Sequence, residues 1–198
     1  NLGSVKSNNY GISYTYKQID YVPNPSRGLS FLLEGAAGTR KSQVSDTSET
    51  LRSNTFRGKI IGEIFIPLAK RHTIRINSST EFYFADRIYE NEVYRYGGLN
   101  SQRGFNEDAL FATTKTTATI EYRFLLDKNS HVFAFYDQSW YENNAKTYYN
   151  DAPFGFGAGF AFNTNFGVFS ISYALGKEFS NPILFSNSKV HFGYIVYF

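Results

Sequence analysis

The sequence lacks cysteine and methionine, has one tryptophan, and contains no run of about 18 apolar residues. Without cysteine there is no disulfide framework to interpret, and without a long apolar run there is no candidate transmembrane helix. The net charge is only +3 and the basic residues do not cluster, so the sequence carries no electrostatic footprint for nucleic acid. The segment of residues 1–7 is short and polar and does not form a secretory signal.

Aromatic residues, in contrast, are abundant: the chain has 16 tyrosines and 20 phenylalanines, yet its mean hydropathy is −0.36. Aromatic side chains are favoured in strands and at membrane interfaces. High aromatic content with a polar average is typical of a barrel whose strands face lipid on one side and water on the other. A soluble β-sandwich is the competing fold class.

Period-two alternation of apolar and polar residues dominates the chain, and helical periodicity is nearly absent. Between Ile120 and Phe124, for example, apolar side chains alternate with Glu121 and Arg123. The pattern predicts an all-β, antiparallel fold of about nine strands. The expected strands are Tyr10–Tyr16, Leu29–Gly35, Phe56–Pro67, Thr73–Ala85, Thr113–Leu125, Val132–Tyr141, Phe154–Phe162, Gly167–Gly176 and Ser188–Phe198.

The connections between these strands are predicted to alternate between short and long. The expected long loops are Thr39–Asn54, Asp86–Ala112, Glu142–Pro153 and Lys177–Asn187. Outer-membrane barrels have short periplasmic turns and long extracellular loops. Their polar interior also accommodates charges on successive strands, which a sandwich core would not tolerate unpaired. We therefore expect a multi-pass β-barrel in the bacterial outer membrane, in contact with outer-membrane lipid.

The predicted number of strands is odd, whereas complete bacterial outer-membrane barrels have an even number. If the last strand ends at the periplasmic side, the first strand begins at the outer face. We therefore expect residues 1–198 to form a partial barrel domain, with further strands upstream.

The C-terminal residues form a first specific motif. His191, Gly193, Val196 and the terminal Phe198 supply a polar residue, a glycine and alternating hydrophobic residues. This arrangement resembles the β-signal by which outer-membrane barrels are recognised for assembly, through pairing of an exposed strand edge. An ordinary last strand that ends on phenylalanine is the alternative interpretation, and the motif indicates a barrel of any function.

A second motif lies in the longest predicted loop, where Arg103, Gly104 and Phe105 are consecutive. They resemble the Arg-Gly-Phe/Tyr motif in the sixth extracellular loop of the BamA/TamA-type assembly barrels and their two-partner-secretion relatives. The resemblance implies that the loop folds back into the lumen and that its arginine pairs with an acidic residue. Asp137 is the expected partner, because residues 135–139 resemble the family's Phe-x-Asp-x-Gly motif, with Ser139 where glycine is usual. Glu121 is a second candidate partner.

Physical chemistry supports this pairing independently of the family. A guanidinium that enters a narrow lumen loses water and needs a carboxylate to offset the cost. Asp137 and Ser139 share the polar face of their strand, and Gly104 allows a tight turn beside Arg103. A solvated loop arginine is the alternative interpretation.

The resemblance implies a function as well as a fold. Five predicted strands follow the loop, as in the family's sixteen-strand barrel, so the chain is expected to be the C-terminal part of such a barrel. Members of the family insert proteins into the outer membrane: periplasmic POTRA domains deliver unfolded clients to a weak seam between the first and last strands. The expected partners are therefore unfolded outer-membrane proteins and assembly-complex lipoproteins.

Two other functions remain compatible with the same motifs. A two-partner-secretion pore exports one dedicated protein, and related barrels anchor a patatin-like phospholipase domain. A passive porin leaves the Arg-Gly-Phe loop unexplained.

No catalytic or metal chemistry is predicted for the chain itself. We find no nucleophile beside a base, and His72, His131 and His191 lack metal-ligand spacing. In Gly155–Gly159 glycine alternates with Phe156 and Ala158 and no helix follows, so small residues facing a lumen are expected there. We expect a protein that is not an enzyme and has no cofactor.

Overall fold

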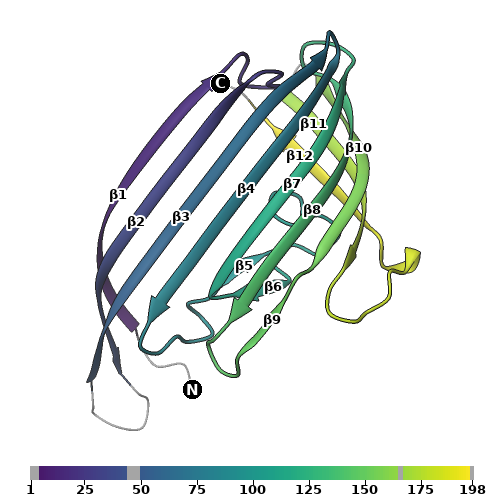
Figure 1. Ribbon diagram of the computed structural model, residues 1–198. Coiled ribbons are helices and arrows are strands. Elements are labelled where there is room, and N and C mark those ends of the chain that lie inside the picture. Colours follow the sequence, from purple (N-terminus) through teal and green to yellow (C-terminus); the bar gives the residue numbers. More distant parts are fainter. Residues whose placement is uncertain (1–4, 44–49, 165–166, 197–198) are drawn as a thin grey trace.

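The computed structural model describes residues 5–43, 50–164 and 167–196, which form one large antiparallel sheet and one small one (Figure 1). The large sheet has the strand order β1-β2-β3-β4-β7-β8-β10-β11-β12, with β9 paired to β8 beside it, and β5 and β6 form the small sheet. The elements are β1 (Val5–Ile19), β2 (Gly28–Gln43), β3 (Thr50–Ala69), β4 (His72–Ala85), β5 (Tyr94–Tyr96), β6 (Leu110–Ala112), β7 (Thr114–Leu125), β8 (His131–Asn143), β9 (Tyr149–Asp151), β10 (Phe154–Thr164), β11 (Gly167–Lys177), the 3-10 turn η1 (Phe185–Asn187) and β12 (Lys189–Ile195).

This architecture confirms the predicted all-β antiparallel class, with nine strands along the main path of the sheet. The sheet is strongly curved, and β1 and β12 are its two edges; within the described residues it does not close (Figure 1). β5 and β6 belong to the connection between β4 and β7, which lies on the concave side. Across the described part of the chain, no helix is long and apolar enough to span a membrane.

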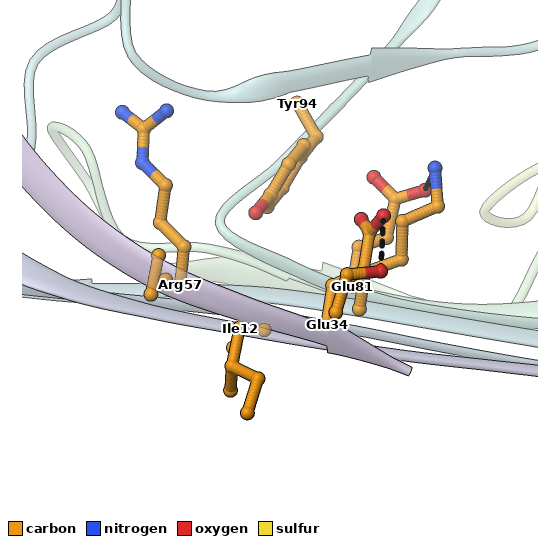
Figure 2. A pocket seen from close by; sticks show the side chains of 11 residues that line it. Ile12, Glu34, Arg57, Glu81 and Tyr94 are labelled. Atoms are coloured by element: carbon orange, nitrogen blue, oxygen red, sulfur yellow. Dashed lines mark hydrogen bonds and ion pairs between the residues drawn. The ribbon is translucent and has the colours of Figure 1, made fainter. Parts of the chain in front are cut away.

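The two faces of the sheet differ as the alternation predicts. On the convex face, Ile120 is 55% exposed, whereas Glu121, its neighbour on the concave face, is 3% exposed. The same contrast is visible on β1–β4, where Ile12 points away from the concave side and Arg57 and Glu34 point toward it (Figure 2). An apolar outer face and a polar, charged inner face are the arrangement of a barrel that stands in lipid.

One predicted loop is wrong. Residues 39–43 and 50–54, expected in the loop Thr39–Asn54, belong to β2 and β3, which continue in register so that Thr39 pairs with Asn54 and Lys41 with Arg52. Backbone pairing extends beyond the apolar band, where the side chains no longer need to alternate between lipid and water. Hydrophobic alternation therefore ends before the strands do. The rest of the connection, residues 44–49, lies outside the described residues.

Other boundaries differ in smaller ways. The predicted loop Asp86–Ala112 contains the hairpin of β5 and β6, and the predicted loop Glu142–Pro153 contains β9. The last strand was expected to run from Ser188 to Phe198, but β12 ends at Ile195, and Phe198 lies outside the described residues.

The connections place the long loops at one end of the sheet. From β3 onward the alternation of short and long connections is as predicted: two residues join β3 to β4, and the turn from β7 to β8 is closed by Asp127. The Asp127 carboxylate accepts hydrogen bonds from the backbone N–H groups of Asn129 (2.7 Å) and Ser130 (2.8 Å). The short turns and the end of β12 lie together at the opposite end from the long loops (Figure 1). In an outer-membrane barrel this is the periplasmic end.

Candidate functional site

β7 and β8 carry the polar residues of the site on their concave faces. Because the strands pair in register, Thr119 lies directly across from Asp137, and Thr117 lies across from Ser139. The Thr119 hydroxyl donates a hydrogen bond to Asp137 Oδ1 at 2.8 Å, and the Thr117 and Ser139 hydroxyl oxygens are 3.0 Å apart. Asp137 is only 1% exposed. A carboxylate buried to this extent needs a cation or several hydrogen-bond donors.

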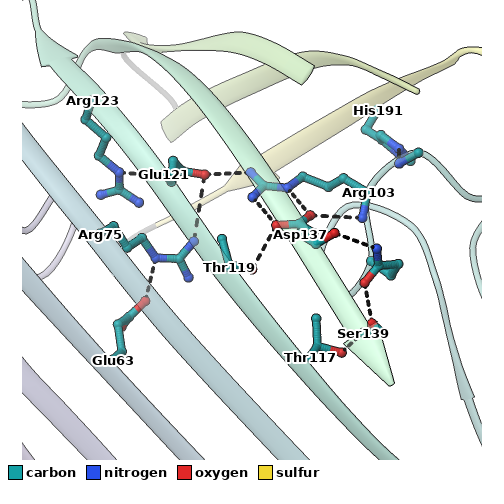
Figure 3. Close-up of polar contacts among 12 residues, drawn as sticks. Glu63, Arg75, Arg103, Thr117, Thr119, Glu121, Arg123, Asp137, Ser139 and His191 are labelled. Carbon is teal, nitrogen blue, oxygen red and sulfur yellow. Dashed lines mark hydrogen bonds and ion pairs between the residues drawn. The ribbon is translucent and has the colours of Figure 1, made fainter. Parts of the chain in front are cut away.

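The structure brings Arg103 of the long loop to this carboxylate (Figure 3). Its guanidinium donates two parallel hydrogen bonds to Asp137, from Nε to Oδ2 at 2.8 Å and from Nη2 to Oδ1 at 2.7 Å. Nη1 forms a third bond, 2.6 Å long, to Oε2 of Glu121. The guanidinium also lies over the ring of Phe135, 3.5 Å from its centroid. Arginine suits this position because its planar fork matches a carboxylate and stacks on an aromatic face.

The surroundings of Arg103 keep it charged. Burial by itself lowers the pKa of the guanidinium, but the hydrogen bond to Asp137 and the charges of Glu121 and Asp137 outweigh burial and raise the pKa above its usual value. The loop is therefore held at the sheet by a permanent cation.

The Arg103 pair is part of a longer row of charges that crosses the concave face (Figure 3). Glu121 Oε1 accepts a bond of 2.8 Å from Arg123, and its other oxygen lies 3.9 Å from Arg75, which in turn bonds Glu63 at 2.6 Å. The row contains as many carboxylates as guanidiniums: Glu63, Arg75, Glu121, Arg123, Arg103 and Asp137. Balanced charges can be buried at a much lower cost than an unpaired one.

Glycines allow the backbone of the loop to approach the sheet. Gly104 has a φ of 93°, in the left-handed region, and a Cβ there would lie 2.7 Å from the backbone carbonyl of Leu175. A Cβ on Gly155 of β10 would clash with the backbone oxygen of Arg103, so this glycine leaves room for the loop. The Gly104 N–H donates to Nε2 of His191 on β12 at 3.1 Å. Phe105 is buried in a cluster with Tyr96, Leu110, Ala112 and Tyr141.

Gln102 is a site residue that the sequence motif did not reveal. It is fully buried; its amide Nε2 donates to the backbone oxygen of Asp137 at 3.2 Å, and its Oε1 accepts a hydrogen bond from the Ser139 hydroxyl. Ser139 thus uses its hydroxyl to hold the loop. In the sequence, only its position beside Arg103 pointed to Gln102, because a loop has no alternation of apolar and polar residues from which a buried side chain could be predicted.

Replacing Ser139 with alanine is expected to lower the free energy of unfolding by about 1–3 kcal/mol, because Gln102 Oε1 loses its donor in a buried place. The measurement is urea unfolding of the protein in lipid vesicles, followed by tryptophan fluorescence. Ser78→Ala is the matched control, since Ser78 is exposed on the outer face of β4. Equal unfolding midpoints for the two variants would show that the Ser139 hydroxyl does not hold the loop.

A second attachment of the loop involves Arg40 of β2, which lies in the part of the strand predicted as loop. Its guanidinium bonds Glu92 (2.5 Å) and the backbone oxygen of Arg87 (2.5 Å), and it is 2% exposed. Glu92 also accepts hydrogen bonds from the Tyr83 hydroxyl and the Tyr89 N–H, each at 3.0 Å. The beginning of the loop, with Arg87, Tyr89 and Glu92, is therefore held to β2 and β4. Continuing the two-residue alternation past Gly35 would have placed Arg40 on the inner face.

Two of the hollows that the described residues line lie on the concave side. One, of about 420 Å³, lies between β1–β4 and Tyr94 of the loop, with Arg57 and Glu81 among its lining residues (Figure 2). The other, of about 600 Å³, separates the loop at Leu99–Ser101 from the short-turn end. Within the ranges that the structure describes, no group of three or more His, Asp or Glu side chains is placed to hold a metal ion.

Two residues of the C-terminal motif belong to β12. His191 and Gly193 lie on the concave face of β12, where the Leu99 side chain occupies the space that a Cβ on Gly193 would need. Val196 follows the end of β12, and Phe198 is outside the described residues.

Comparison with known proteins places the chain in a family. A family model described as the Omp85 superfamily domain matches residues 2–194, nearly the whole sequence. No curated protein matches the chain.

Proposed function

Because the chain belongs to the Omp85 superfamily, we propose that it inserts proteins into the bacterial outer membrane in the manner of the BamA and TamA barrels. Members of the superfamily form outer-membrane barrels that act in the insertion or secretion of proteins. The finer assignment is carried by one observation: the long loop occupies the concave side and is anchored there beside the last strand.

The anchored loop obstructs a direct path through the lumen. Arg103 holds its part of the loop at β8, the Arg40–Glu92 pair holds the beginning of the loop at β2, and Phe105 packs into a buried cluster. A polypeptide that crossed the lumen would have to break these buried ion pairs, and each one is expensive to separate. A route along the edge of the sheet leaves them intact.

The edge strand supplies such a route. β12 pairs with β11 along Lys189–Ile195, and its other edge pairs with no strand of the described chain. A strand edge whose partner separates is a template for a further strand. In this proposal the sequence is the C-terminal part of a sixteen-strand barrel, the opposite side of the seam lies upstream, and POTRA domains and accessory lipoproteins deliver unfolded clients.

The proposal is tested by reconstituting the whole protein into phospholipid vesicles and adding a urea-denatured outer-membrane barrel as client. We expect the client to fold several times faster than in vesicles that contain an unrelated barrel. Folded client is measured as the fraction that resists SDS before heating.

A soluble passenger protein offered to the same vesicles tests the alternative of export. Protease-protected passenger inside the vesicles, with no gain in client folding, would show a secretion pore and contradict the proposal. Equal client folding in both kinds of vesicle would contradict it as well.

A further inference from the structure

A row of basic side chains crosses β1, β2 and β3 at the long-loop end of the sheet. In the strand register Lys6 lies opposite Lys41, and Lys41 lies opposite Arg52. All three side chains are exposed. They share a face with Tyr10 and Phe56, which lie four residues away along β1 and β3, so the row is on the convex, lipid-facing side.

Such a row needs an anion. Like charges placed directly opposite one another across strands repel and destabilise the sheet. Within the described ranges of the chain, no ion pair or side-chain hydrogen bond involves Lys6, Lys41 or Arg52. The neighbouring Arg40 faces inward and has Glu92 as partner. The described residues therefore supply no ion pair for the outward row.

The height of the row matches the headgroup layer of the outer leaflet. Tyr10 and Phe56 end the apolar band, and four residues of strand cover about 13 Å, or roughly 10 Å along the membrane normal for a tilted strand. Long loops mark the outer side of the membrane. Between the apolar band and the basic row lie Asn8, Thr39 and Asn54, also paired in register and exposed.

We propose that Lys6, Lys41 and Arg52 bind the phosphate groups of a phosphorylated glycolipid of the outer leaflet, of the lipopolysaccharide class. Neighbouring strands are about 4.8 Å apart, so the three cations span about 10 Å. This width fits a headgroup with more than one phosphate better than the single phosphate of a phospholipid. The hydroxyl and amide groups of Asn8, Thr39 and Asn54 offer hydrogen bonds to its sugars. This binding site is independent of the proposed insertion activity.

The test compares the whole protein, purified in detergent, with its triple variant Lys6→Gln, Lys41→Gln, Arg52→Gln. Affinity for purified lipopolysaccharide is measured by native mass spectrometry and by fluorescence titration. Since one basic residue near an anionic surface contributes about a fivefold gain in affinity, the triple variant is expected to bind on the order of 100 times more weakly. The double variant Lys70→Gln, Arg71→Gln, in the turn at the opposite end of β3, is the matched control and should bind like the unmodified protein.

Three further measurements use the unmodified protein and do not depend on how the variants fold. Binding is expected to weaken strongly at 1 M salt, where the screening length falls to about 3 Å. Lipopolysaccharide stripped of its phosphates should bind poorly, and so should vesicles of phosphatidylethanolamine and phosphatidylglycerol. Equal affinity for the dephosphorylated glycolipid, for the phosphatidylglycerol vesicles, or for the triple variant would overturn the proposal.

Discussion

Replacing Asp137 with alanine is expected to lower the free energy of unfolding by about 3–5 kcal/mol, because it removes the carboxylate that accepts a bidentate pair of hydrogen bonds from the buried guanidinium of Arg103. Asp137 accepts three hydrogen bonds from Arg103, two from the guanidinium and one from the backbone N–H at 3.2 Å. Glu121 remains as a partner, but it is shared with Arg123 and Arg75. The measurement is the urea unfolding midpoint in vesicles, together with the fraction of protein that stays folded in SDS before heating.

The pair can be isolated with a double-mutant cycle. Arg103→Ala alone is expected to lower stability and the yield of heat-modifiable folded protein. The double variant should lose less than the sum of the two single variants, because removing both charges leaves neither uncompensated. Asp86→Ala is the control, since Asp86 is exposed at the start of the loop. If Asp137→Ala and Asp86→Ala unfold alike, or if Arg103→Ala leaves the folded yield undiminished, the ion pair does not brace the barrel.

Replacing Gly104 with alanine is expected to cost about 2–6 kcal/mol, the sum of strain at a positive φ and overpacking. The added Cβ would lie 2.7 Å from the carbonyl carbon and oxygen of Leu175 and 2.8 Å from the nitrogen of Gly176. These are backbone atoms of a paired strand, which cannot swing aside as a side chain can. The loop should therefore leave the concave face and take Arg103 with it.

Limited trypsin digestion detects that displacement directly. Arg103 is 7% exposed and is protected while the loop is seated; the variant should be cleaved after Arg103 much faster than the unmodified protein. Gly62→Ala is the matched control, because a Cβ on Gly62 meets no atom within 4 Å. Unchanged protection of Arg103 in the Gly104 variant would mean that the close approach to β11 is not required for seating the loop.

Much of this fold could be predicted from local pattern. Alternation such as Ile120-Glu121-Tyr122-Arg123 determines which side chains face lipid, since successive residues of a strand point to opposite faces whatever the strand pairs with. The Arg-Gly-Phe motif likewise led to Arg103 and Asp137, which the structure brings together at 2.7 Å. Where the membrane no longer imposes alternation, prediction failed: the outer parts of β2 and β3 were expected to be loop.

What only the tertiary structure decided is the set of partners that depends on register and on the path of the loop. Gln102 bonds Ser139, and Arg40 bonds Glu92, which is 52 residues away in the sequence. Pairing between distant strands also places Lys6, Lys41 and Arg52 in one row. The sequence by itself determined an all-β chain with one apolar and one polar face and a long loop that carries the Arg-Gly-Phe motif. The two faces could be predicted because the side chains of neighbouring residues in a strand point to opposite sides. Contacts between distant strands follow only from their alignment, which a shift of one residue would rearrange completely.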